Sequence, residues 1–288
     1  MPGKSSVMCY DLLAVTKENM MRPSVVKAKL ARREPVLVAC LHLIDPSLYE
    51  LTSLMGYDAI WMDLEHHAQS VETASSLMRA ARVGGSDIMA RPAKGEFMRM
   101  GRLLEAGAAG IMYPRCESAA EAAEVVRWCK FAPLGRRGFD GGNPDMPYCS
   151  MPIAEYIRAA NDQTFVVVQI EDAGAVEAAD EIAAVPGVDV LFIGPADLSI
   201  LSGLPGQFDH PRVQAEIERV AAAARAGGKQ WGMPCASAEQ AKRLLAQGAT
   251  FLAHGCDIVM VIQGLTRVQQ EFAPLGFRFA NRLASSGS

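Results

Sequence analysis

Two carboxylates stand just after two strongly apolar stretches of this 288-residue chain. Glu171 follows residues 164–170, and Asp197 comes shortly after residues 188–193. If these stretches are neighbouring strands of one parallel sheet, both carboxylates lie at the same edge. Hard oxygen ligands on adjacent loops suit Mg²⁺ or Mn²⁺, which keep positions open for water and substrate. The alternative for either residue alone is an ordinary loop acid that caps a helix.

An arginine and a histidine extend this set. Arg91 ends another apolar run, directly before Pro92, where its guanidinium could fix a carboxylate or stabilise an oxyanion. Histidine has an ordinary pKa near neutrality, which makes His66 a candidate general base. Asp63 stands close enough in the sequence to orient it. The alternatives are an ion pair between Arg91 and an acid at the same edge, and a histidine with a purely structural role.

Eight short apolar runs must position these side chains, and they alternate with longer stretches of helical period. This alternation predicts parallel strands joined by helices. The predicted strands are residues 36–41, 58–63, 87–91, 110–113, 164–170, 188–193, 229–233 and 250–253. The predicted helices are residues 46–55, 70–83, 96–106, 119–130, 176–184, 212–226 and 239–246. The glycines that stand where helix C-caps would lead into strands are Gly56, Gly107, Gly187, Gly228 and Gly248.

The number of strands favours a single-domain α/β fold, the (β/α)8 or TIM barrel, over a doubly wound open sheet. An open sheet that binds a dinucleotide would carry a glycine-rich turn after its first strand, and residues 42–46 contain no glycine. In a barrel, function collects where strands end and βα loops begin. Residues 131–150, rich in Gly, Pro, Arg and Asp, are long enough to form an active-site loop or lid.

The composition excludes several classes of protein. Half of the residues are hydrophobic, and 28 Lys and Arg against 32 Asp and Glu give a formal net charge of −4. These values exclude a disordered chain and give no basis for a nucleic-acid partner. We find no apolar run long enough to span a bilayer and no signal pattern in residues 1–6. Seven cysteines without CxxC pairing argue against a disulfide framework or a structural zinc site, and favour a cytoplasmic location.

The two ends of the chain differ from its middle. We interpret residues 1–34 as an N-terminal extension and residues 35–288 as the barrel domain. Residues 24–33 could form a short amphipathic helix that packs on the barrel or on a neighbouring subunit.

Four motifs resemble the HpcH/HpaI aldolase family, and the resemblance runs from about Pro35 to Ile262. The motifs are Gly56-Tyr-Asp-Ala-Ile-Trp-Met-Asp63-Leu-Glu65-His66, Leu104-Glu-Ala-Gly-Ala-Ala-Gly110-Ile, Gln169-Ile-Glu171 and Val185-Pro-Gly-Val-Asp-Val-Leu-Phe-Ile-Gly194-Pro-Ala-Asp197-Leu-Ser199. The family comprises class II, metal-dependent pyruvate aldolases. The resemblance therefore implies an enzyme that reversibly cleaves a 4-hydroxy-2-oxo acid, of the 2-keto-3-deoxy sugar acid or 4-hydroxy-2-oxo-dioate type, to pyruvate and an aldehyde.

The resemblance also implies roles for individual residues. Glu171 and Asp197 would hold a divalent cation (Mg²⁺, Mn²⁺ or Co²⁺) that chelates the 2-oxo and carboxylate oxygens of the pyruvate group. Arg91 would stabilise the enolate, and His66, oriented by Asp63, would act as the base on the C4 hydroxyl. The residues expected to line the pyruvate site are Gln169, Gly194, Pro195 and Ala196, together with Arg91. Glu105 replaces an aspartate that is usual in the family and is thought to raise the basicity of the histidine.

Departures from the family pattern leave the aldehyde substrate open. His67 stands where the family commonly has glycine, residues 139–145 differ from the usual loop, and His42 and His254 add basic groups at strand ends. Schiff-base catalysis would need a lysine inside the barrel at the carboxyl end of a strand. Three lysines are relevant to this alternative mechanism, and none is predicted at such a position, which disfavours it. They are Lys94, Lys130 and Lys229.

Two alternative functions remain. One is a related acyl-CoA or phosphoenolpyruvate-type lyase on the same barrel, and the other is a non-catalytic protein that binds 2-keto acids. The family is usually hexameric, a dimer of trimers. The resemblance therefore implies a homo-oligomer, with a C-terminal helix near residues 265–272 docking on a neighbouring subunit.

Overall fold

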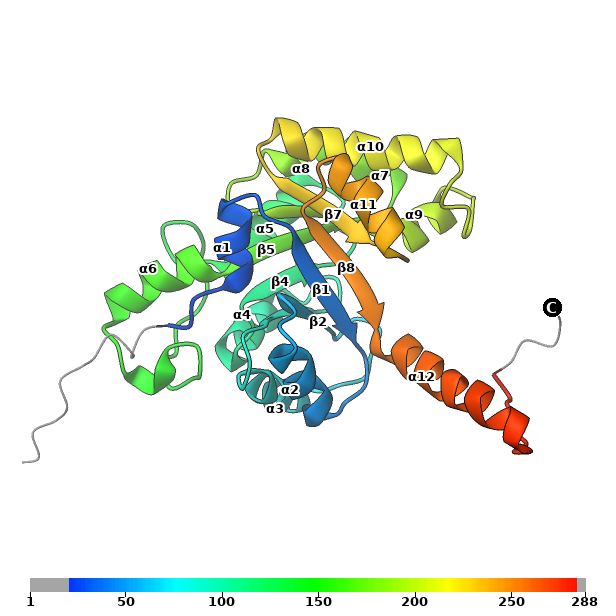
Figure 1. Cartoon of the computed structure of the whole chain (residues 1–288). Coiled ribbons are helices and arrows are strands. Elements are labelled where there is room, and N and C mark those ends of the chain that lie inside the picture. Colours follow the sequence, from blue (N-terminus) through cyan, green and yellow to red (C-terminus); the bar gives the residue numbers. More distant parts are fainter. Residues whose placement is uncertain (1–20, 284–288) are drawn as a thin grey trace, which may run out of the picture.

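The computed structural model describes residues 21–283, and its centre is a barrel of parallel strands (Figure 1). The strands are β1 (Val36–Leu41), β2 (Ala59–Asp63), β3 (Asp87–Arg91), β4 (Gly110–Tyr113), β5 (Phe165–Ile170), β6 (Val190–Ile193), β7 (Gln230–Pro234) and β8 (Phe251–Cys256). They follow one another around the barrel in chain order, and β1 closes it by pairing with both β2 and β8. The prediction of a (β/α)8 barrel is confirmed.

Helices surround the barrel, and those between consecutive strands connect the carboxyl end of one strand to the amino end of the next. The helices are α1 (Val25–Ala31), α2 (Pro46–Leu54), α3 (Val71–Ala81), α4 (Phe97–Ala106), α5 (Ala119–Cys129), α6 (Ile153–Gln163), α7 (Ala173–Glu177), α8 (Ala179–Ala183), α9 (Pro195–Leu201), α10 (Pro211–Ala226), α11 (Ala238–Ala246) and α12 (Asp257–Phe272). Helix α1 precedes β1, and α12 follows β8. The five glycines expected before strands all adopt a positive φ, between 69° and 126°. Each therefore occupies a left-handed position that ends a helix at little steric cost.

Alternate strand residues build two apolar layers, one inside the barrel and one between barrel and helices. Aromatic side chains dominate the inner layer, where Trp61, Phe165, Phe192 and Phe251 pack with Val38. Residues of opposite parity, such as Ile60 and Val168, pack against the helices. Both faces of the strands are therefore buried, which explains their nearly continuous apolar sequence.

Helix α1 closes the amino end of the barrel. Val26 and Leu30 belong to the inner apolar layer, and Ser24 caps the helix by accepting a hydrogen bond from the Lys27 amide. Ser24 Oγ also donates to Asp87 at the start of β3, at 2.6 Å. Residues 24–31 of the predicted extension are thus packed into the barrel, whereas residues 1–20 lie outside the described part of the chain.

Residues 131–150 lie at the amino end of the barrel and not at its carboxyl rim. They follow helix α5 and precede α6, so they form an αβ connection at the end opposite the βα loops. Met146 and Met151 pack there with Met21, Phe131 and Tyr156. The prediction of an active-site lid within this chain was therefore wrong, because the insertion follows a helix and not a strand.

Helix α12 leaves the barrel at the end of β8 and projects away from it (orange to red in Figure 1). Most of its apolar side chains are exposed, including Ile258, Val261, Leu265 and Phe272. The predicted C-terminal helix is real but starts eight residues earlier than residue 265, at Asp257. Within residues 21–283, no helix is long and apolar enough to cross a membrane.

Candidate active site

A buried ion pair between Arg91 and Asp63 forms the centre of the carboxyl rim. The two residues end neighbouring strands, β3 and β2, and are direct partners in the strand register. Arg91 Nε donates to Asp63 Oδ1 at 2.9 Å, and Nη2 donates to Oδ2 at 2.7 Å. Burial opposes ionisation of Asp63, but the hydrogen bonds and charge of Arg91 outweigh it and lower the pKa of that carboxyl. This bidentate pairing fixes the plane of the guanidinium at the mouth of the barrel.

Three further residues hold the guanidinium in place. Arg91 Nη1 donates to Gln169 Oε1 at 3.2 Å, which links β3 to β5 across the mouth. The guanidinium carbon lies 4.6 Å from the ring centre of Trp61, which covers the inner core below. Glu65 Oε2 lies 3.2 Å from Arg91 Nε. Arg91 is therefore fixed from below and from both sides, while guanidinium N–H groups not used in these contacts remain for an anionic ligand.

Glu171 is a buried carboxylate with an unsatisfied oxygen. It follows β5, is 3% exposed, and its Oε1 has no hydrogen-bond partner in the described chain. Burial and, secondarily, the charge of Asp197 raise its pKa to about 7. An unpaired buried acid costs several kcal/mol in general, so its retention indicates a ligand that supplies positive charge.

Gly194 makes room for this carboxylate. A Cβ at Gly194 would lie 2.7 Å from Glu171 Cγ and 3.1 Å from Oε1, which is too close for any side chain. Pro195 and Ala196 then begin α9, whose first turn carries Asp197. The predicted pyruvate-lining residues thus border the predicted metal ligand.

Asp197 is more open than Glu171, with 38% of its side chain exposed. Its Oδ1 lies 3.5 Å from Arg115 Nη2, which comes from the loop after β4. One buried and one accessible carboxylate on neighbouring loops suit a cation that keeps water and substrate among its ligands. The unpartnered Glu171 oxygen and the space provided by Gly194 show that these residues fit a divalent cation.

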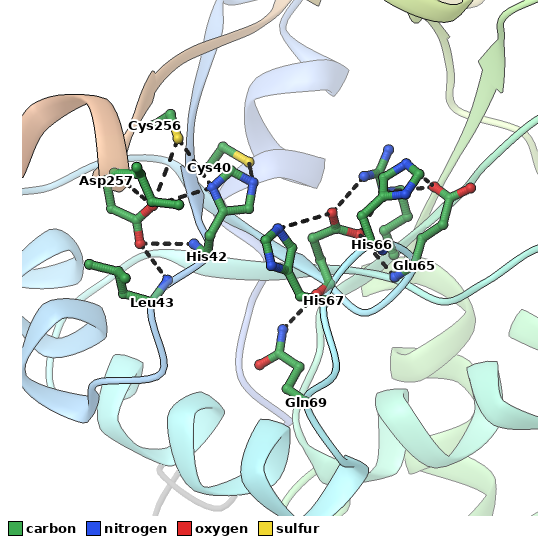
Figure 2. Close-up of polar contacts among 12 residues, drawn as sticks. Cys40, His42, Leu43, Glu65, His66, His67, Gln69, Cys256 and Asp257 are labelled. Carbon is green, nitrogen blue, oxygen red and sulfur yellow. Dashed lines mark hydrogen bonds and ion pairs between the residues drawn. The ribbon is translucent and has the colours of Figure 1, made fainter. Parts of the chain in front are cut away.

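The structure separates the two histidines that follow β2. His66 is 62% exposed at its side chain, and its Nε2 lies 3.6 Å from Glu65 Oε2 (Figure 2). His67 Nε2 lies 3.9 Å from Asp63 Oδ2, and its ring contacts that of His42 at a tilted angle, with centres 4.4 Å apart. Asp63 contacts His66 through the backbone amide, at 3.4 Å, and its carboxylate is committed to Arg91. The expected orientation of the His66 ring by Asp63 is therefore absent from the described structure.

Glu105 lies far from His66 within the chain. It belongs to the last turn of α4, which runs antiparallel to the strands and ends at the amino end of the barrel. Burial raises its pKa, and the charges that act on it come mainly from Arg137, Asp140 and Asp145 in the loop after α5. One chain alone does not bring Glu105 to the rim, because a helix returns its C-terminal residues to the opposite end.

None of the three lysines named above offers a free amine inside the mouth. Lys94 forms an ion pair with Glu117 at 2.6 Å, outside the Arg91 cluster. Burial lowers the pKa of Lys130 to about 8, but its ammonium donates to the carbonyls of Asn161 and Thr164. Lys229 donates to the carbonyl of Val185 at the amino end. This geometry supports the exclusion of Schiff-base chemistry.

Two residues of the site had no assigned role in the sequence interpretation. Glu65 lies against Arg91, and its Oε2 is buried without a hydrogen bond in the described chain. Trp61 supports the guanidinium from below. The two-residue spacing of Trp61, Asp63 and Glu65 was a usable signal, because alternate residues of a strand point to one face.

Fold and site together define a barrel enzyme whose rim combines an anion-binding arginine with carboxylates suited to a divalent cation. A family model described as HpcH/HpaI aldolase/citrate lyase matches residues 38–264. The chain belongs to this family, and the prediction made from its motifs is confirmed.

Named relatives cover most of the chain. It is 35% identical over 237 residues to the hydroxypyruvate/pyruvate aldolase of Delftia acidovorans, covering 82% of this chain and 88% of that one. It is 34% identical over 246 residues to a 4-hydroxy-2-oxo-heptane-1,7-dioate aldolase of Escherichia coli, covering 85% and 94%. The crystal structure of an HpcH/HpaI aldolase from Desulfitobacterium hafniense superimposes with a TM-score of 0.82 at 30% identity, covering 93% of this chain and 100% of that one. These relatives confirm the prediction of an enzyme of the aldolase class.

Proposed function

We propose that this enzyme cleaves a 4-hydroxy-2-oxo acid reversibly to pyruvate and an aldehyde. The observation that carries the proposal is the unpartnered, buried oxygen of Glu171 close to the Arg91 cluster. A 2-oxo acid offers a carboxylate and a carbonyl oxygen to such a cation-binding rim. Relatives named for pyruvate and 4-hydroxy-2-oxo-dioate substrates support this substrate class.

Glu171 and Asp197 would hold a divalent cation, which supplies Lewis-acid polarisation of the 2-oxo group when bound. Mg²⁺, Mn²⁺ and Co²⁺ all suit this oxygen donor set. Gln169 and the backbone of residues 194–196 border the position of the pyruvate group. Asp63, Gln169 and Trp61 hold Arg91 so that its free N–H groups face the developing enolate oxygen.

We assign His66 as the base. It would take the proton of the C4 hydroxyl, the C3–C4 bond would break, and its electron pair would pass to C3 as the enolate. The C4 hydroxyl oxygen would become the carbonyl oxygen of the released aldehyde, and proton transfer to C3 from the protonated His66 or from water would give pyruvate. Exposure leaves the His66 ring free to reach the C4 side of a substrate, whereas His67 is held between His42 and Asp63.

Removal of the cation tests the proposal. Exhaustive chelation should abolish pyruvate formation from a panel of 4-hydroxy-2-oxo acids, and Mg²⁺, Mn²⁺ or Co²⁺ should restore it. Glu171→Gln should lower both cation affinity and activity, whereas Glu177→Gln, an exposed acid on α7, should change neither. Full activity after complete removal of the metal would overturn the proposed mechanism.

A second experiment separates catalysis from mere binding of a 2-oxo acid. Exchange of pyruvate methyl protons in D₂O requires enolisation but no aldehyde, so the enzyme should accelerate it above the rate with metal alone. Exchange at that background rate would favour the non-catalytic alternative. Binding of CoA in a titration, without binding of pyruvate, would favour the acyl-CoA lyase alternative.

We also propose that α12 docks on a second copy of the chain in a trimeric or hexameric assembly. Its exposed apolar residues and its projection away from the barrel support this arrangement (Figure 1). Val261→Glu with Leu265→Glu should lower the mass measured by light scattering. An unchanged mass would exclude α12 as the interface.

The six cysteines of the described residues are all free, which supports the proposed cytoplasmic location.

A further inference from the structure

A second cluster of ligand-type side chains lies where β1, β8 and α12 meet (Figure 2). His42 follows β1, Cys256 ends β8, and Asp257 begins α12. The rings of His42 and His67 are tilted against each other with centres 4.4 Å apart, and ligand atoms of His42, Asp63 and His67 lie within 4.8 Å of one another, so this cluster adjoins the Arg91–Asp63 pair. The proposed aldol chemistry does not use these three residues.

The three ligand atoms stand at the separations that a bound metal ion would require. His42 Nδ1 lies 3.1 Å from Cys256 Sγ and 3.3 Å from Asp257 Oδ1, and the sulfur lies 3.8 Å from the same oxygen. In a tetrahedral zinc site, with Zn–N and Zn–O near 2.0 Å and Zn–S near 2.3 Å, the corresponding separations are roughly 3.3–3.6 Å. Small side-chain adjustments would therefore place all three around one ion.

We propose that His42, Cys256 and Asp257 form a second metal site, specific for a borderline-soft divalent cation such as Zn²⁺ or Co²⁺. A thiolate and an imidazole favour such ions, whereas Mg²⁺ requires oxygen ligands. The site is thus chemically distinct from the all-carboxylate pair Glu171 and Asp197. The two sites should bind different cations at the same time.

The surroundings hold these ligands in position. Asp257 Oδ2 accepts from the backbone amides of His42 and Leu43, at 2.8 and 2.7 Å, and Oδ1 accepts from the amide of Ile258 at 2.8 Å. With Nδ1 on a metal, His42 Nε2 would carry its proton and face Cys40 Sγ at 3.4 Å. A partner on the remote nitrogen fixes the tautomer and ring orientation of a metal-binding histidine.

The charge of the cluster also favours a cation. Asp257 is 1% exposed, and within residues 21–283 no lysine or arginine nitrogen lies within 4 Å of its carboxylate. In the described chain this buried carboxylate is therefore held by three backbone amides, the Cys256 thiol and the His42 imidazole, with no lysine or arginine among its partners.

A cavity borders one of the three proposed ligands, Cys256. It has a volume of about 580 Å³ and is lined by Cys40, Trp61, Cys235, His254 and Cys256, among others. A metal held by three protein ligands beside this cavity could complete its tetrahedron with water. The alternative group His42, Asp63 and His67 is weaker, because the Arg91 guanidinium already neutralises the charge of Asp63, whereas the backbone donors to Asp257 are uncharged.

Cobalt tests this site by a signal that does not depend on activity. The full-length protein is reduced, stripped with a chelator, supplied with excess Mg²⁺ and titrated with Co²⁺. One equivalent per chain should produce a near-ultraviolet thiolate-to-cobalt charge-transfer band with tetrahedral d–d bands, and one equivalent of Zn²⁺ should remove them. A thiol titration of the same sample verifies that the cysteines are reduced.

Variants test whether the thiolate-to-cobalt band arises from Cys256. Cys256→Ser should lose the charge-transfer band and weaken Co²⁺ binding by more than the roughly 10–100-fold typical of losing an outer-shell partner. Cys116→Ser, at a buried cysteine after β4, is the matched control and should keep the band. Glu171→Gln should also keep it, because that variant removes only the carboxylate site.

Two results would overturn the proposal. One is the absence of a charge-transfer band in reduced, folded wild-type protein, and the other is its persistence in Cys256→Ser. If Cys256→Ser unfolds, as judged by circular dichroism, Asp257→Asn replaces it. That variant keeps the sulfur but should weaken Co²⁺ binding in the presence of Mg²⁺, and unchanged binding would count against the site.

Discussion

The two ends of the barrel differ in how completely their buried and half-buried carboxylates are partnered. At the amino end, Asp58 pairs with Lys29 at 2.7 Å and Asp189 pairs with Lys27 at 2.9 Å. Asp87 there accepts from Ser24 Oγ and from the amide of Val26. At the carboxyl end, Glu65 and Glu171 each keep a buried oxygen without a hydrogen-bond partner in the described chain.

We relate this difference to a division of roles, in which the amino end contributes to the stability of the fold and the carboxyl end to the chemistry. The acids at the amino end connect α1 to the strands, and two of them also accept from strand amides, of Leu37 and Val166. Each connection favours the folded state. At the carboxyl end, the unpartnered oxygen of Glu171 is costly in the folded chain alone, and a bound cation would offset that cost.

The largest effect is expected from Arg91→Lys at the carboxyl rim. Lysine keeps the charge but cannot donate in a fork to Asp63 while it faces an oxyanion. We expect kcat to fall by about 10²–10³-fold, the usual cost of losing a positioned oxyanion donor. Steady-state pyruvate formation measures kcat, and a thermal melt verifies that the variant is folded. A variant with near-normal kcat would remove Arg91 from the chemistry and weaken the contrast between the two ends.

The fold was readable from the sequence because strand and helix periods alternate clearly. Five glycines with positive φ marked where helices end. Helices α6 and α9 and the true extent of β8 were missed. The Gly- and Pro-rich stretch before Ile153 hid α6, and His254 and Gly255 interrupt the apolar run within β8.

The sequence predicted which side chains lie at the carboxyl rim of the barrel, but it did not predict which of them pair with one another. Glu171, Asp197, Arg91 and Gln169 stand at strand ends, and the closed barrel brings them to one rim. Proximity in sequence suggested His66 as the partner of Asp63, but the strand register sets Asp63 beside Arg91. Register depends on the packing of the whole barrel, which a local pattern does not contain. The same reason hid the cluster of His42 and Cys256, which are 214 residues apart.

Asp87 at the amino end should produce a measurable pH dependence of stability. Burial raises its pKa from 3.8 to about 6, so the folded chain keeps a proton that the unfolded chain releases between these values. The free energy of unfolding should therefore decrease as the pH rises through this window, with a slope of up to about 1.4 kcal/mol per pH unit from this group.

Asp87→Asn should remove this slope, as measured by urea unfolding at pH 4, 5, 6 and 7. Asp209→Asn, at an exposed position before α10, is the control and should leave it in place. An identical pH profile for wild type and Asp87→Asn would mean that Asp87 is already ionised in the folded chain at low pH.

The smallest effect is expected for Lys27→Met, and it tests most directly whether the amino end contributes to stability without influencing catalysis. Lys27→Met removes the half-buried ion pair with Asp189, whose other oxygen still accepts from the Val166 amide. We expect a loss of about 1 kcal/mol in the free energy of unfolding, against roughly 0–0.5 kcal/mol for Arg225→Met in the exposed pair with Glu218. Neither variant should change kcat/KM for 4-hydroxy-2-oxo acid cleavage by more than about twofold, because neither residue reaches the carboxyl rim. A larger change in kcat/KM for Lys27→Met alone would show that α1 and the amino end influence catalysis, and the two ends would no longer be separable.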